Sequence, residues 1–207
     1  MNPYRTVYKA ASDEFTEKRS RFIGHIQPVS SEEEAAAFIA AKKKEYWDAR
    51  HNVSAYVLRG GLCRFSDDGE PGGTAGMPVL DVLQKEGLQD CCVVVTRYFG
   101  GILLGGGGLV RAYSHAARLA VDAAGRCEMR PCLQLSLACS YAQYGWAAPL
   151  VAAAGGAVTD TDFAEEVTLR FRLPREEREA LQARLTDQSA GTLTLLEEGA
   201  DFYPFPL

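Results

Sequence analysis

The sequence predicts an α+β protein made of two two-layer α/β sandwich domains, residues 1–130 and 131–207. Strand-like and helix-like segments are mixed in both halves, which is the pattern of layered α/β domains. The second half has the order strand–helix–strand–strand–helix–strand, which is typical of a ferredoxin-like split βαβ domain. With 207 residues, 47% of them hydrophobic and 24% charged, the chain has globular composition, and wholesale disorder is excluded.

The first elements follow from capping and turn signals. Residues 21–29 form a short β-prone run, and Ser31 with Glu34 three positions later is a capping-box signal for a helix reaching about Tyr46. Phe38 and Ile39 are expected on its buried face. Two strands, residues 52–59 and 62–66, are then predicted to form a hairpin across a Gly-Gly turn.

The rest of the first half alternates loop, helix and strand. The turn-rich residues 67–78 lead into a helix over about 79–86, which Gly87 ends. Residues 92–98 are an unbroken β-branched run, the pattern of a strand buried on both faces. Four glycines at 105–108 open a helix that Gly125 ends.

Pro131 marks the expected linker, and the second half has a clear alternating pattern. Strands are predicted over residues 133–137, 157–163, 167–173 and 192–196. Helices are predicted over residues 141–154 and from Pro174 onward.

Charge divides with the predicted domains. The whole chain has a net charge of -5, which excludes a polycation that coats nucleic acid by bulk electrostatics. Residues 1–130 contain 17 Lys and Arg against 16 Asp and Glu, whereas residues 131–207 contain 5 against 11. An RNA or other polyanionic partner is therefore expected on the first domain, and a protein partner is possible on the acidic second domain.

The cysteines and the chain start favour a cytoplasmic protein. No apolar core of a secretory signal precedes residue 15, and no stretch is long and apolar enough to span a bilayer. No C-x-x-C pair is present, so a zinc knuckle is not indicated. Reduced thiols are the simplest interpretation of the six cysteines, Cys63, Cys91, Cys92, Cys127, Cys132 and Cys139.

The densest chemical signal is the glycine-rich segment after the buried strand. A strand ending in Arg97 passes through glycines into a helix whose first turns contain Arg111. Free backbone N–H groups, a helix dipole and two guanidinium groups together could bind an anion. The segment fits neither a Walker A loop nor G-x-G-x-x-G. The alternative is that the glycines only permit tight turns and close helix–strand packing.

A second signal is the acidic turn with Asp67, Asp68, Glu70 and Thr74. Its carboxylates could hold Mg²⁺, or they could form turns by accepting bonds from their own backbone. His51 could act as an acid or base, or it could donate a hydrogen bond to a nucleobase, although a lone His is more often structural. No catalytic residues, metal site or cofactor can be assigned from these patterns.

Together these motifs resemble the Impact family. The resemblance is carried by Arg50-His51, by Phe65 to Pro71 with Gly73 to Gly76, and by Val94 to Gly101 with Leu104 to Tyr113. It runs from about Ser20 to Gly125, and the βαββαβ tail suits the two-domain bacterial members. Val53 and Met77 depart from the family pattern, which often has Cys and Lys or Arg there.

The resemblance implies a first domain of the ribosomal protein S5 domain 2-like fold, similar to domain IV of elongation factor G, and a second domain similar to domain V. It also implies a link to translation, because eukaryotic relatives regulate translation initiation. We therefore expect a translation-linked regulator, without an assigned catalytic role, that binds RNA or a ribosomal surface. The expected contacts are Arg50, His51, Arg97, Tyr98, Phe99, Gly100, Gly101, Gly105, Gly107, Gly108 and Arg111. The alternative is an enzyme acting on a nucleotide or another phosphorylated small molecule through the same loop and the acidic turn.

Overall fold

The computed structural model describes residues 2–207, which form two compact units. The first unit contains Tyr4–Glu128 and Pro204–Leu207, and the second contains Met129–Tyr203 with residues 2–3. The predicted boundary between residues 130 and 131 stays a prediction. Pro131, expected in a linker, instead lies within strand β7 (Arg126–Cys139).

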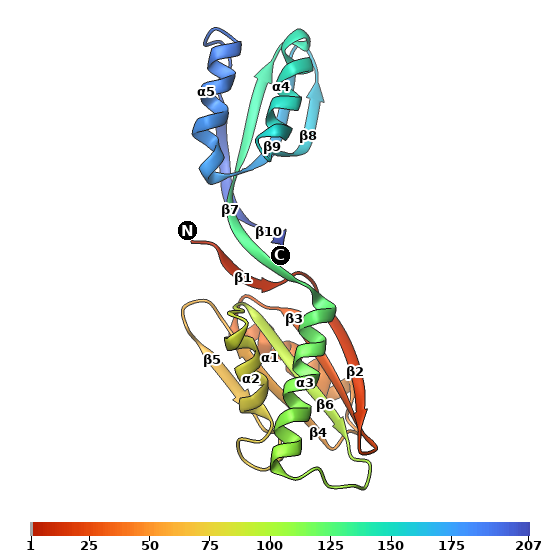
Figure 1. Cartoon of the computed structure of the whole chain (residues 1–207). Coiled ribbons are helices and arrows are strands. Elements are labelled where there is room, and N and C mark those ends of the chain that lie inside the picture. Colours follow the sequence, from red (N-terminus) through yellow and green to blue (C-terminus); the bar gives the residue numbers. More distant parts are fainter. Residues whose placement is uncertain (1) are drawn as a thin grey trace. The chain divides into compact units, whose positions relative to one another are not determined.

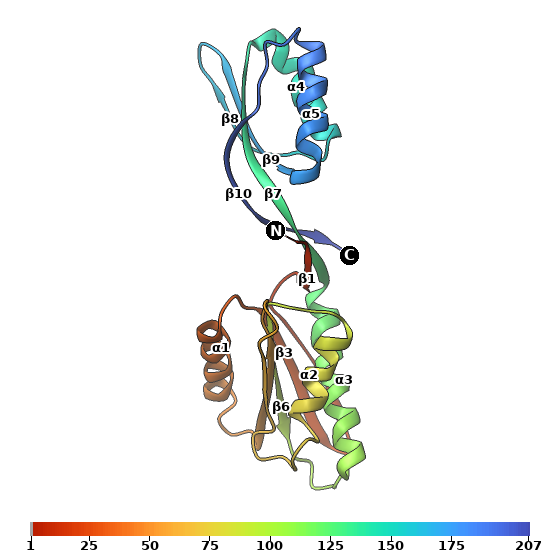
Figure 2. The same ribbon diagram turned by 90° about the vertical axis from the view of Figure 1, so that its left-hand side faces the viewer.

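The first unit is built on a five-stranded antiparallel sheet of order β2-β3-β6-β4-β5. These strands are β2 (Ala11–Glu17), β3 (Ser20–Pro28), β4 (His51–Val57), β5 (Cys63–Ser66) and β6 (Cys91–Tyr98). Helices α2 (Gly76–Lys85) and α3 (Gly106–Ala124) cover one face, and α1 (Glu32–Glu45) covers the other (Figures 1 and 2).

Strand β6 is buried on both faces, as its sequence predicts. Val93 and Val95 pack in the core beneath α2 and α3, whereas Cys92 and Val94 pack with Phe38 beneath α1. Side chains alternate between the two faces of a strand, so this one strand contributes to both hydrophobic layers.

Two strands before residue 20 were not predicted. β1 (Tyr4–Val7) and β2 precede the expected first strand, and most residues of β2 are exposed. Only Ala11 and Phe15 of β2 pack against the core, so this edge strand lacks the alternating apolar pattern that identifies a half-buried strand.

The second unit has the predicted βαββαβ order. β7, β9 (Val167–Pro174) and β8 (Ala157–Phe163) are neighbours in the sheet, and β10 (Leu196–Pro206) pairs with β7. β1 also pairs with β7 in this five-stranded sheet, and the other four strands, in the order β10-β7-β9-β8, have the ferredoxin-like arrangement. Helices α4 (Tyr141–Ala153) and α5 (Arg178–Gln188), the latter preceded by a short 3-10 turn (Arg175–Glu177), complete the unit.

The last strand begins later than predicted. Residues 192–195 are not strand, although Leu193 and Leu195 are buried in the core of the second unit. Gln182 of α5 fixes this segment, because its amide donates to the Leu193 carbonyl and accepts from the Leu195 N–H. The apolar alternation that suggested a strand therefore reflects an extended loop that is anchored to a helix.

Candidate functional site

The sheet register brings the predicted site segments to one end of the first unit. His51 at the start of β4 is paired with Arg97 near the end of β6, and Tyr98 is paired with Arg21 of β3. Because neighbouring strands are antiparallel, the Arg50-His51 turn, the segment after Tyr98 and the β2–β3 turn lie at the same sheet end.

Glu70 is the centre of a buried polar cluster at this end. Its side chain is 3% exposed, and its Oε1 accepts hydrogen bonds from Arg97 Nη1 at 2.7 Å and from the Tyr113 hydroxyl at 2.6 Å. His51 Nε2 lies 3.8 Å from the same oxygen. Burial and the bond to Glu70 both raise the pKa of Tyr113, so its hydroxyl remains a donor.

Arg97 is a largely buried residue, whereas the sequence suggested a surface cation, and its role in binding an anion stays a prediction. Its side chain is 6% exposed, and its guanidinium lies 5.5 Å from the centre of the Phe22 ring and 5.4 Å from that of Phe99. Its Nε is buried without a hydrogen-bond partner, and Glu70 takes the one hydrogen bond that its guanidinium makes within residues 2–207. The sequence shows the charge of Arg97 but does not show its burial.

The acidic turn is a structural element. Asp67 accepts bonds from the backbone N–H groups of Gly73, Ala75 and Gly76 at 2.8–3.2 Å. Burial alone would raise the pKa of Asp67, but these three donors outweigh it and keep that pKa below its ordinary value. Thr74 also bonds locally, since its hydroxyl donates to the Pro71 carbonyl at 2.6 Å.

Asp68 connects this turn to the sheet. Its carboxylate accepts from Lys43 Nζ and from the Asn52 backbone N–H, each at 2.6 Å. All three carboxylates that could have held magnesium, Asp67, Asp68 and Glu70, thus bond to other groups of the protein. In residues 2–207, no group of three or more His, Cys, Asp or Glu side chains is arranged to hold a metal ion.

His51 has a defined orientation. Its Nδ1 lies 2.7 Å from the backbone carbonyl oxygen of Asp68. A carbonyl only accepts, so Nδ1 carries the proton, and in the neutral ring Nε2 keeps its lone pair. The acidic turn therefore orients the imidazole so that Nε2 is on the Glu70 side.

A cavity of about 260 Å³ opens beside this cluster. Its polar walls include Arg50, His51, Glu70 and Arg97, and its apolar walls include Phe99 and Leu103. Phe99 is 41% exposed and Leu103 is 81% exposed, so the cavity continues onto an open apolar rim.

Tyr113 and Leu103 were missed as site residues, because the sequence places Tyr113 only on the apolar face of its helix.

The glycine-rich segment has a mainly structural explanation. A Cβ at Gly100 would lie 2.0 Å from the backbone carbonyl of Arg19, so only glycine allows the loop to pack on the β2–β3 turn. Gly105 caps α3 with φ of 72° and gives the helix no side-chain cap. Gly101, Gly107 and Gly108 lie outside the cavity, and a Cβ at Gly107 would meet only Arg111 at 3.8 Å.

Arg111 and Tyr98 do not reach the cavity. Arg111 lines a separate pocket with Gly108, Phe15 and Lys18. The Tyr98 hydroxyl donates to Asp48 at 2.8 Å, and the Arg21 guanidinium lies over its ring. The predicted site residues are therefore divided: some line the Glu70 cavity, Gly108 and Arg111 line the second pocket, and the others, such as Tyr98 and Gly100, line neither.

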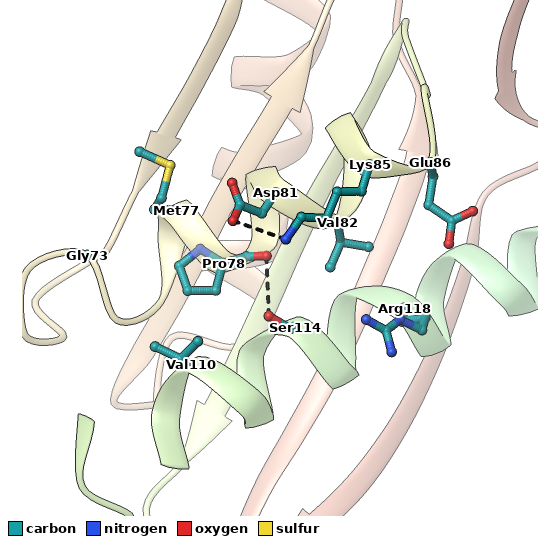
Figure 3. A pocket seen from close by; sticks show the side chains of 10 residues that line it. All are labelled: Gly73, Met77, Pro78, Asp81, Val82, Lys85, Glu86, Val110, Ser114 and Arg118. Carbon is teal, nitrogen blue, oxygen red and sulfur yellow. Dashed lines mark hydrogen bonds and ion pairs between the residues drawn. The ribbon is translucent and has the colours of Figure 1, made fainter. Parts of the chain in front are cut away.

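A third hollow of about 300 Å³ lies between α2 and α3 (Figure 3). Met77, Pro78 and Val110 form one part of it, Lys85 and Asp81 pair at 3.6 Å, and Arg118 lies farther along α3 (Figure 3). Met77, one of the two departures from the family pattern, lines this groove and not the Glu70 cavity. Val53, the other, is fully buried in the core.

The fold and the site define a two-domain α/β protein with a buried charged cluster at one sheet end of its first unit. The chain belongs to the Impact family. The Impact N-terminal domain matches residues 18–121, and a domain of unknown function (DUF1949) matches residues 137–192. No helix within residues 2–207 is long and apolar enough to cross a membrane.

Similar proteins cover most of the chain. IMPACT family member YvyE of Bacillus subtilis is 36% identical over 97% of both chains, and IMPACT family member YigZ of Escherichia coli is 38% identical over 86% of this chain and 90% of its own. Protein IMPACT of Mus musculus is 34% identical over 44% of this chain and 30% of its own. A solved crystal structure of a hypothetical protein, 35% identical, covers 95% of this chain and 97% of its own with a TM-score of 0.61. These comparisons confirm the predicted family and α+β fold.

Proposed function

We propose that this protein is a translation-linked regulator whose first unit binds RNA at the sheet end that contains the Glu70 cavity. The observation that supports this proposal is that exposed cations and exposed apolar side chains lie together at that end. Single-stranded RNA presents both phosphates and unstacked bases, and proteins bind it with a basic surface interspersed with stacking side chains.

The cations of this surface are available for phosphate. Lys18, Arg19, Arg50 and Arg111 are exposed, and none of these four side chains has an ion-pair partner within the described part of the chain. Lys18 and Arg19 form the β2–β3 turn with φ of 45° and 66°, a tight turn that presents two cations together. This surface is local, which reconciles phosphate binding with the net charge of -5.

The translation link rests on the family. The resemblance of the two domains to domains IV and V of elongation factor G supports a ribosomal RNA surface as the docking partner. The reducing compartment in which translation occurs also suits the six free cysteines, five of which are buried.

Anisotropy of a fluorescent single-stranded RNA tests this function with a charge-matched control. Replacing both Arg50 and Arg111 with Ala should weaken binding by about tenfold or more, because both side chains are exposed and unpaired. Replacing Arg175 and Arg184 of the second unit removes the same charge and should leave the affinity nearly unchanged. Absence of RNA binding by the unmodified protein at low salt would overturn the function.

The alternative enzymatic function has one supporting observation, the oriented His51 Nε2 beside the cavity. A general base needs such a fixed lone pair. A thermal-shift screen with nucleotides and sugar phosphates tests it, because a tight small ligand stabilises the folded state by mass action. No shift with any of them would count against an enzyme.

A further inference from the structure

We propose that the Glu70 cavity binds a single unpaired guanine base of RNA, an inference that rests on the proposed RNA-binding function. The hydrogen-bonding groups that line the cavity match those of guanine and not those of adenine or uracil.

The cavity contains two acceptors in fixed positions. Arg97 and Tyr113 both donate to Glu70 Oε1, and no described residue donates to Oε2. In the neutral imidazole, His51 Nε2 is the second acceptor, because Nδ1 donates to the Asp68 carbonyl. Both residues line the cavity, and their side chains are only 3% and 13% exposed.

Arg97 supplies the donor. Its Nη1 is used by Glu70, while its Nη2 has no partner within residues 2–207. Of the guanidinium nitrogens, Nε is buried without a partner among the described residues, and Nη2 is free to donate to a ligand acceptor.

One donor and two acceptors match the Watson–Crick edge of guanine. Guanine offers the acceptor O6 together with the donors N1–H and N2–H₂. Adenine offers one donor group on that edge, and uracil offers one donor between two acceptors, so each would leave Glu70 or His51 without a proton to accept. A buried acceptor that is left unpaired lowers the binding affinity, so the cavity discriminates against adenine and uracil in favour of guanine.

Size and the apolar wall fit one base. The volume of about 260 Å³ is below the range of about 300–1,000 Å³ typical of pockets for whole drug-sized ligands. The exposed ring of Phe99 provides a stacking surface, and Arg50 at the rim can contact the adjoining phosphate.

The test uses uridine nonamers with one central guanosine, inosine, adenosine or uridine and measures their affinity for the unmodified full-length protein. Inosine lacks only the N2 amine of guanine, so it isolates one donor. The guanosine RNA should bind on the order of tenfold tighter than the adenosine RNA, with inosine between them. Equal affinity for all four RNAs would overturn the inference and leave the proposed function standing, whereas absence of binding by any RNA would refute both.

Two variants locate the effect. Phe99→Leu should reduce the preference for guanosine severalfold, because it keeps an apolar side chain but loses the aromatic face. Ile102→Ala is the control, since Ile102 is also 41% exposed on the same loop but does not line the cavity. An unchanged preference in Phe99→Leu would overturn the placement of the base. Guanosine monophosphate binding as tightly as the nonamer would also overturn it, by assigning the cavity to a free nucleotide.

Discussion

The hydroxyl of Tyr113 should contribute measurably to the stability of the first unit. It is fully buried and donates to Glu70 at 2.6 Å, while its ring packs edge-on against Phe22 with centroids 5.3 Å apart. Tyr113→Phe removes the hydroxyl and leaves the ring contact in place. A hydrogen bond to a charged group contributes about 1.5–3 kcal/mol, so the free energy of unfolding should fall by that amount.

Native-state hydrogen exchange of the β6 amides is a suitable assay, because Val93–Val95 are fully buried in the centre of the first sheet. Their opening free energy reports the first unit separately from the second. Combining Tyr113→Phe with Glu70→Gln in a double-mutant cycle should give a coupling of about 0.5–3 kcal/mol, because the two side chains are in direct contact. A single-variant cost below about 0.5 kcal/mol, together with additive effects, would refute the view that this cluster stabilises the sheet end.

Three further predictions concern stability. Burial, with a smaller effect of Lys42, lowers the pKa of His25 from 6.5 to about 4. The contribution of the neutral imidazole to the free energy of unfolding is therefore complete above pH 6.5 and is lost as pH falls toward 4. That loss should lower the free energy of urea unfolding by on the order of 3 kcal/mol, and His25→Gln should reduce the loss. If the variant and the unmodified protein show the same dependence of stability on pH, His25 is not the group responsible. Gly100→Ala should cost at least about 1–3 kcal/mol in the same assay, because its Cβ would overlap the Arg19 backbone, whereas Gly72→Ala, with open space around it, should cost little. Ser140→Ala breaks the capping box of α4 and should lower stability by about 0.5–2 kcal/mol, measured by exchange of Leu150 and Val151 amides; unchanged exchange would count against the cap.

Local signals predicted most of the secondary structure. Ser31 caps α1 as expected, since its hydroxyl accepts from the Glu34 N–H at 3.3 Å. The reciprocal bond differs from a capping box, because the Glu34 carboxylate accepts from the N–H of Ser30 and not from that of Ser31. The hairpin turn and the ends of α2 and α3 follow their glycines, all of which have positive φ.

The parts that escaped prediction depend on tertiary contacts. β2 is an exposed edge strand, and β10 is defined by pairing with β7, so neither has an apolar pattern of its own. At the site, the sequence shows that Arg97, Glu70 and His51 are polar. It does not show that Arg97 and Glu70, which are 27 positions apart in the chain, form a hydrogen bond of 2.7 Å between Nη1 and Oε1. Because Arg97 is buried, its guanidinium pairs with the Glu70 carboxylate inside the protein.

The salt dependence of RNA binding tests the central claim most directly. For single-stranded RNA, each neutralised phosphate contributes about 0.7 to the slope of log affinity against log salt concentration. Replacing both Arg50 and Arg111 with Ala should therefore reduce the slope by about 1.4, while replacing both Arg175 and Arg184 should leave it unchanged. An equal slope for the unmodified protein and the Arg50 and Arg111 double variant would contradict RNA binding at this sheet end.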